Sequence, residues 1–146
     1  MFAHAAQKVF GWFGGPGFRG TLGYCREAME LPTPVAVLAI AAEFFGSVGL
    51  ILGFFTRVAA LAIALVMLFA IVLVHLRFGL FANWFGNKDG EGFEYHLLVI
   101  TVAIVLVIRG AGPLSFDYRI ASKAEAAAAP QEDAATVLLF VRSLPF

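Results

Sequence analysis

The feature that most constrains the fold is an uninterrupted apolar run at residues 58–74, bracketed by Arg57 and His75. It holds seventeen residues without a charge. In a helix that rises ~1.5 Å per residue, the run spans roughly 25 Å, and its flanks extend it to the thickness of a bilayer. Composition agrees, since 61% of the residues are hydrophobic and 14% are charged, whereas soluble domains have about a quarter charged. We therefore predict a transmembrane helix here.

Two further segments are apolar enough to be spans. Residues 35–55 contain one charge, Glu43, and twelve Val, Ile, Leu or Phe side chains. At ~0.3–0.6 kcal/mol each, these favour insertion by on the order of 5 kcal/mol, which exceeds the roughly 3 kcal/mol cost of a central acidic residue. Residues 93–108 are shorter, but Arg109 and the Gly- and Pro-containing stop behind it predict a third span. The short link before residue 58 predicts an antiparallel hairpin.

The two ends of the chain are less regular. Residues 1–13 look like the second half of a helix, and at roughly 20 Å they are too short to cross. Either this helix dips into the membrane beside its neighbours or its natural start lies upstream of Met1, and we expect the second.

The predicted fold is thus an all-α transmembrane four-helix bundle over residues 1–121. Residues 122–146 are an Ala-rich segment that we expect to be a mobile tail, the alternative being contact of its apolar end with the membrane surface.

Antiparallel packing of four helices brings polar residues from all of them to one side of the membrane. The ends of the first and third segments share that side with the starts of the second and fourth. The ionisable side chains placed there are His4, Lys8, Glu43, His75, Glu94, Tyr95 and His96. Aromatic side chains that would form an interfacial belt on the same side are Trp12, Phe13, Trp84 and Phe85. The sequence therefore predicts a one-sided polar cluster.

Glu43 lies at the centre of this prediction. It shares a helical stripe with small residues, Ala39, Ala42, Gly46, Gly49 and Gly53, and small residues allow close helix packing in lipid. Glu43 therefore points into the bundle, where its carboxylate needs a cationic partner from among Lys8, His4, His75 and His96. An intramembrane carboxylate favours a functional site, the alternative being a structural ion pair. Alternatively, the histidines and Lys8 are solvated residues at the membrane interface. Glu94 is alternatively a loop carboxylate or one that is favoured at the start of a helix.

Several functions are excluded or disfavoured. Ten basic and ten acidic residues give no net charge, so nothing points to nucleic acid as a partner. The single cysteine, Cys25, excludes an intramolecular disulfide and a metal or dithiol site built on cysteines, and it is interpreted as an apolar filler. We expect no metal site, since the acidic residues of 86–92 do not have the spacing of a calcium loop. Paired histidines on facing helices, such as His4 and His75, are a known way to ligate haem, but we do not expect haem here.

Several short motifs occur in a fixed order along the first 119 residues. They are HAAQK at 4–8, GWFGG at 11–15, EFFG at 43–46, LGFFTR at 52–57, GFEYHLL at 92–98 and GAGPLSFD at 110–117. Together they resemble the DoxX family of small bacterial membrane proteins. The resemblance implies a four-helix bundle in the cytoplasmic (inner) membrane. It also maps the family's polar positions onto His4, Gln7, Lys8, Glu43, His75, Glu94 and Tyr95. Members usually have more of a helix before the HAAQK motif, in line with a start upstream of Met1.

Relatives in the family include the small subunit type of thiosulfate:quinone oxidoreductase and a membrane oxidoreductase complex linked to thiol and oxidative stress. The resemblance therefore implies a redox-associated membrane subunit that contacts lipid and a protein partner, with quinone as the candidate cofactor. In that interpretation Glu43, His75, Lys8 and Tyr95 are the candidate catalytic residues. The candidate cofactor-binding residues are His4, Gln7, Glu94 and His96, which would contact quinone or complete a polar network.

Three functions remain open at this point. The first is a quinone-linked oxidoreductase subunit whose electrons come from a partner, because the chain has no evident electron carrier. The second is a non-catalytic anchor or assembly partner of a redox complex, with homo-oligomers also open. The third is a small transporter, which ranks last because the sequence shows no inverted repeat and no broken helix. Five basic residues on each side leave the orientation undecided, and following the family we place the polar cluster outward and the tail in the cytoplasm.

Overall fold

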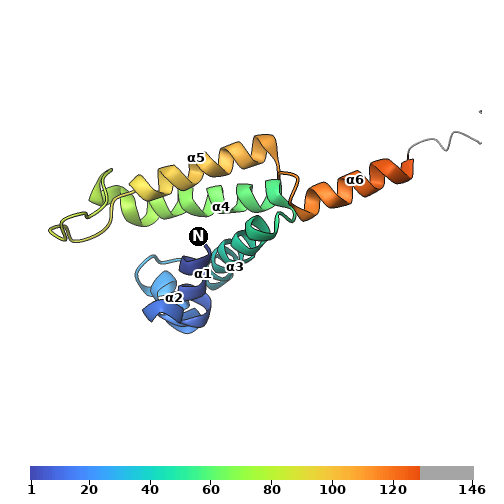
Figure 1. Ribbon diagram of the computed structural model, residues 1–146. Coiled ribbons are helices and arrows are strands. Elements are labelled where there is room, and N and C mark those ends of the chain that lie inside the picture. Colours follow the sequence, from blue (N-terminus) through green and yellow to red (C-terminus); the bar gives the residue numbers. More distant parts are fainter. Residues whose placement is uncertain (129–146) are drawn as a thin grey trace, which may run out of the picture.

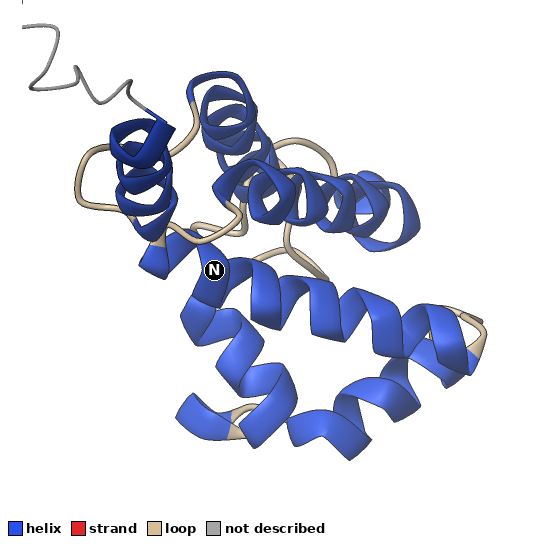
Figure 2. Cartoon of the chain, turned by 90° about the vertical axis from the view of Figure 1, so that its right-hand side faces the viewer, coloured by secondary structure: helices blue, strands red, loops and turns tan. Residues whose placement is uncertain are grey.

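The structure is a computed structural model that describes residues 1–128, and these residues form helices without any strand (Figure 2). The α-helices are α1 (Phe2–Phe10), α2 (Gly17–Glu27), α3 (Thr33–Leu52), α4 (Thr56–Ala70), α5 (Glu94–Arg109) and α6 (Phe116–Ala128). Trp12–Gly14 and Leu76–Phe78 are 3₁₀ turns, and Ile71–His75 is π-helical. The predicted all-α class is thus confirmed for the described residues. The predicted tail begins within α6, and its residues 129–146 lie outside the described part.

The predicted apolar segments all form helices, with shifts at their ends. Thr33–Leu52 and Thr56–Phe78 are each long and apolar enough to cross a membrane. Helix α5 has 16 residues, fewer than the ~20 of a typical span. Helix α1 ends at Phe10, three residues before the predicted end, because Gly11 adopts a left-handed conformation that terminates it. Helix α2 adds to the predicted set, in a segment whose glycines lower its helix propensity.

The distribution of side chains is that of a membrane protein rather than of a soluble one. The buried core is built largely from small residues, Ala5, Ala6, Ala36, Ala59, Ala60 and Ala103, with Ile63 and Met67 among the larger ones. Large apolar side chains such as Phe45 and Phe69 are instead exposed on the outer faces of α3 and α4. In water such exposed apolar faces would promote aggregation. In a bilayer they are solvated by lipid, and small residues make the contacts between helices.

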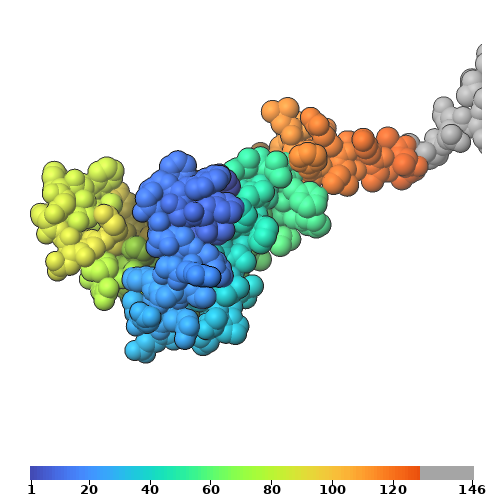
Figure 3. All heavy atoms as spheres, turned by 90° about the horizontal axis from the view of Figure 1, so that it is seen from below, coloured from blue at the N-terminus to red at the C-terminus, as the bar shows by residue number. Residues whose placement is uncertain are grey.

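The helices are arranged as two groups that meet where α3 turns into α4. Figure 1 shows α4 and α5 side by side, with α3 crossing α4 at an angle and α1 and α2 packed beside α3. The close α3–α4 contact depends on Gly46 and Gly49, because a Cβ on either would lie 3.0–3.3 Å from atoms of α4 or of the turn before it. The loop at residues 79–92 and helix α6 lie at opposite ends of the molecule (Figures 1 and 3).

The turn between α3 and α4 is fastened by the segment that follows α5. Both carboxylate oxygens of Asp117 accept hydrogen bonds from the first amides of α4, those of Phe55 and Thr56, each at 2.8 Å. The Asp117 amide donates to the Gly53 carbonyl at 2.9 Å. Gly53 has a φ of 63°, and any Cβ there would collide with Ser115. The motifs at residues 52–57 and 110–117 are therefore two halves of one joint.

Replacing Asp117 with alanine is expected to loosen this joint by about 1–2 kcal/mol, as for other lost helix N-caps. The hydrogen bond from the Thr56 backbone holds the pKa of Asp117 below its usual range. Because the pKa is lower in the folded state, the ionised carboxylate stabilises the protein at every pH above its ordinary pKa of about 3.9. This stabilisation is lost as the pH falls through the lowered pKa. The difference between wild type and variant, measured by unfolding in mixed micelles, should be full at pH 7 and should vanish in acid. Glu125→Ala, which removes an exposed carboxylate from the same helix, should change nothing; an equal loss there would contradict the capping role.

Candidate functional site

The polar residues of four helices line one cavity of about 380 Å³ between the two helix groups. This volume is in the range of small-molecule sites. The predicted site residues that line it are His4, Lys8, Glu43, His75, Tyr95 and His96. The chain has three histidines, and all three lie in this cavity. The structure therefore brings together six of the eight predicted site residues, from α1, α3, the π-helical segment that follows α4 and the start of α5.

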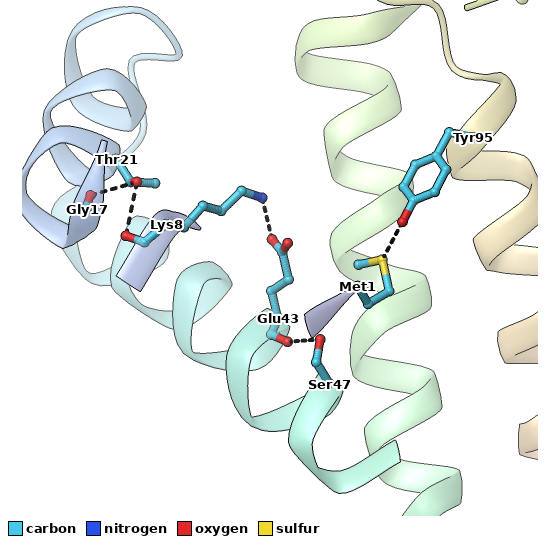
Figure 4. Close-up of polar contacts among 7 residues, drawn as sticks. All are labelled: Met1, Lys8, Gly17, Thr21, Glu43, Ser47 and Tyr95. Carbon is cyan, nitrogen blue, oxygen red and sulfur yellow. Dashed lines mark hydrogen bonds and ion pairs between the residues drawn. The ribbon is translucent and has the colours of Figure 1, made fainter. Parts of the chain in front are cut away.

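An ion pair closes one wall of the cavity (Figure 4). The Lys8 Nζ atom lies 2.5 Å from Oε2 of Glu43, whose side chain is 3% exposed while that of Lys8 is 38% exposed. Both residues are held in place by their neighbours. The Thr21 hydroxyl donates to the Lys8 carbonyl at 3.1 Å, and the Ser47 hydroxyl donates to the Glu43 carbonyl at 2.6 Å. Of the four cationic partners considered for Glu43, the structure selects Lys8.

The opposite wall is a row of rings. His4 and Tyr95 have ring centroids 5.6 Å apart, Tyr95 and His96 5.9 Å, and His96 and His75 4.1 Å. The Tyr95 hydroxyl donates to the Met1 sulfur at 3.3 Å, which ties the start of α1 to α5 (Figure 4). In its neutral form each imidazole has one donor and one acceptor nitrogen, so this row offers groups that can give or take a proton.

His75 is oriented by the backbone around it. It ends the π-helical segment Ile71–His75, and such segments are rare and often lie at functional sites. Its Nδ1 atom lies 2.7 Å from the Glu91 carbonyl. Because a carbonyl only accepts, Nδ1 must be the donor, and neutral His75 keeps Nε2 as an acceptor.

Two polar atoms in the cavity wall have no partner among the described residues. They are Oε1 of Glu43 and Nδ1 of His96, and both are buried. Leaving a buried polar group unpaired costs about 1–3 kcal/mol, and native proteins rarely leave such groups without an explanation. Both atoms belong to residues that line the cavity, although the atoms themselves have almost no accessible surface.

The other two predicted site residues lie outside the cavity lining. The Gln7 amide donates to the Phe13 carbonyl at 3.3 Å. The Glu94 carboxylate accepts from the Ala82 amide at 3.1 Å and from Trp84 Nε1 at 3.2 Å, so it organises the loop at residues 79–92. That loop contributes lining residues that the sequence does not predict, Ala82, Glu91 and Gly92. No residue type or spacing marked them, because a loop's path over a helix end is a tertiary feature.

Cys25 lies in α2, is 9% exposed and has no disulfide partner among the described residues. Burial raises the pKa of its thiol, with a smaller opposing effect from the positive charge of Lys8. The thiol is therefore protonated and poorly nucleophilic at neutral pH. This environment agrees with its interpretation as a filler side chain.

Comparison with known proteins gives one match. The family model DoxX matches residues 1–76, which is just over half of the chain. The matched segment includes His4, Lys8, Glu43 and His75 and ends before Tyr95 and His96. No curated protein and no solved structure matches the chain.

Proposed function

Because the chain belongs to the DoxX family of membrane proteins, we propose that it is a multi-pass subunit of the bacterial cytoplasmic membrane. In this proposal α3, α4 and α5 cross the membrane, and α1, which is too short to cross it, packs against α3 as the fourth helix of the bundle, with lipid around the exposed apolar faces. The exposed Trp12, Phe13, Trp84 and Phe85 would lie at the interface on the cavity side. We place that side outward and the end of α5 at the cytoplasmic face.

The function that the cavity supports best is binding of a quinone head group for a redox system. The observation that carries this proposal is a small cavity between apolar helices whose lining includes Lys8 and all three histidines. A quinone has two carbonyl oxygens on opposite sides of its ring and needs a hydrogen-bond donor at each. Lys8 can donate on one wall and His96 on the other, since neutral His75 offers only an acceptor nitrogen, while the apolar helix faces suit an isoprenoid tail.

Reduction of such a quinone consumes two electrons and two protons and yields a quinol. The described residues contain no electron carrier, and the single cysteine is a buried thiol. We therefore assign the electrons to a partner protein, for example one that oxidises two thiols to a disulfide. The protons would come through the row of His4, Tyr95, His96 and His75, with Glu43 exchanging a proton beside Lys8.

A second candidate function is that of a non-catalytic anchor for a redox complex. It is favoured by the contacts that join helices, namely the Lys8–Glu43 pair between α1 and α3 and the Tyr95–Met1 bond between α5 and the chain start. In that case the polar residues stabilise the bundle, and the cavity holds water.

Filling the cavity should separate the two functions. Purified protein in lipid nanodiscs is expected to bind a short-chain benzoquinone at one saturable site, measured by calorimetry against empty nanodiscs. Ala82→Trp, which adds bulk to the lining without removing a polar group, should weaken binding at least about tenfold, or ~1.4 kcal/mol. Ala124→Trp on the exposed face of α6 is the matched control and should bind like wild type. Absence of saturable binding by wild type would favour the anchor function.

A further inference from the structure

A second cavity, of about 420 Å³, lies at the other end of the helices. It is lined by the start of α4 and the end of α5, together with the beginning of α6. In Figure 1 this is the junction from which α6 projects, at the end of α4 and α5 away from the loop at residues 79–92. The proposed quinone site does not use it.

Two arginines line this second cavity without an acidic partner among the described residues. They are Arg57 and Arg109, whereas the ion pair formed within residues 1–128 is that of Lys8 with Glu43. Asp117 also lines the cavity, but both of its oxygens are occupied by the Phe55 and Thr56 amides. Arg57 lies against Gly110, where a Cβ would stand 3.3 Å from its Nε atom. The charged lining is therefore positive on balance, with two guanidinium groups available.

Backbone amides at the start of α4 also have no hydrogen-bond partner among the described residues. The amides of Arg57 and Val58 make no hydrogen bond within residues 1–128, although the first-turn amides of a helix need an external acceptor. Thr56 also lines the cavity, but its side chain is 3% exposed and its hydroxyl lies beside the Asp117 carboxylate, so it is not a free donor. Unpaired guanidinium and amide donors around one cavity suit a ligand with several acceptor oxygens and negative charge.

The position of the cavity indicates where that ligand comes from. Arg57 and Arg109 stand at the ends of the apolar helices, at the level of lipid head groups. Exposed apolar side chains lie close by in the chain, with Phe55 at 63% and Leu114 at 91% exposure, and they can contact acyl chains. A soluble anion would gain nothing from such a surround.

We propose that this second cavity, bounded by Thr56, Arg57, Arg109 and Tyr118, binds a phosphate group, and that a phospholipid of the adjoining leaflet supplies it. The two guanidinium groups contact the phosphate oxygens, and the free amides at the start of α4 complete the site. The bound lipid thereby joins α4, α5 and α6 at the joint that Asp117 fastens.

The test compares thermal unfolding of the full chain in nanodiscs of phosphatidylcholine alone and of phosphatidylcholine with phosphatidylglycerol, with inorganic phosphate as a separate arm. Phosphatidylglycerol should raise the Tm of wild type, and Arg57→Gln/Arg109→Gln should lose most of that rise. Arg119→Gln/Lys123→Gln removes two exposed cations from α6 outside the cavity and should keep it. Arg57→Lys/Arg109→Lys keeps the charge without the planar fork and should keep a smaller rise. Each variant is first compared in lipid-free detergent, so that a loss of folding is recognised.

Two results would support phosphate recognition and two would overturn it. Loss of the phosphatidylglycerol effect in the Arg57/Arg109 variant alone supports the lipid as the source. Stabilisation of wild type by inorganic phosphate that depends on the same two arginines supports the site with a soluble source. An equal loss in the Arg119/Lys123 variant would mean general surface attraction and would overturn the proposal. So would a wild type that responds to neither probe.

Discussion

Replacing Lys8 with methionine is expected to destabilise the protein by about 3–5 kcal/mol, because it leaves a buried carboxylate without its cation. Glu43 is 2% exposed, and the only partner of its side chain among the described residues is Lys8. Methionine preserves much of the volume of the lysine stem, so the loss reflects charge rather than a cavity. The measurement is unfolding in mixed micelles. Lys123→Met, which removes an exposed lysine from α6, is the matched control and should change little.

The double variant Lys8→Met/Glu43→Gln should recover most of this loss. It removes both charges together, and replacing a whole buried ion pair is often close to neutral. The coupling energy from the four proteins of the cycle isolates the pair from the effects of each side chain alone. Additive losses, with no recovery in the double variant, would contradict a direct interaction between Lys8 and Glu43.

The same double variant should lose quinone binding even though it is stable. This is the second large expected effect, since the variant removes the lysine donor on one wall and neutralises the carboxylate beside it. We expect affinity for a short-chain benzoquinone to fall by at least about thirtyfold, or ~2 kcal/mol, as expected for a lost hydrogen bond to a charged group. Calorimetry in nanodiscs measures it, with Lys123→Met as the control.

A stable double variant that binds the quinone as well as wild type would assign the ion pair to the structure alone. In that case Lys8 and Glu43 serve only to join α1 to α3. The quinone proposal would then rest on the histidines and Tyr95. If those residues also proved dispensable for binding, the anchor function would be the better account.

The sequence predicts the apolar helices and the one-sided cluster because both depend on simple periodicity. Charge-free runs locate the helices, and antiparallel order then places His75 near His96 and Lys8 near Glu43. The inward direction of Glu43 also follows from pattern, because Gly46 and Gly49 on its stripe contact α4. Burial of Glu43 and its pairing with Lys8 agree with that expectation.

Other features depend on tertiary contacts that no local pattern encodes. Gln7 and Glu94 have the residue types of a site, yet their side chains bond to the Phe13 carbonyl and to the loop at residues 79–92. Asp117 looks like an ordinary loop acid, and its function as the cap of α4 depends on a partner about sixty positions away. The helix α2 forms in spite of its glycines because it packs on α1 and α3.

The central claim is that the cavity holding all three histidines is a ligand site rather than a closed structural network. Nitrogen NMR of protein labelled with ¹⁵N only in histidine tests it directly, because His4, His75 and His96 all line this cavity and the chain has no other histidine. Single His→Asn variants assign the signals. The probe is a short-chain benzoquinone added to the labelled protein in nanodiscs.

The account predicts that the imidazole signals of His75 and His96 shift and saturate with the quinone, at the concentration at which calorimetry shows binding. The Ala82→Trp variant should show no such shift. Histidine signals that stay unchanged through a full titration of wild type would contradict the claim, since a ligand in this cavity cannot avoid its histidines.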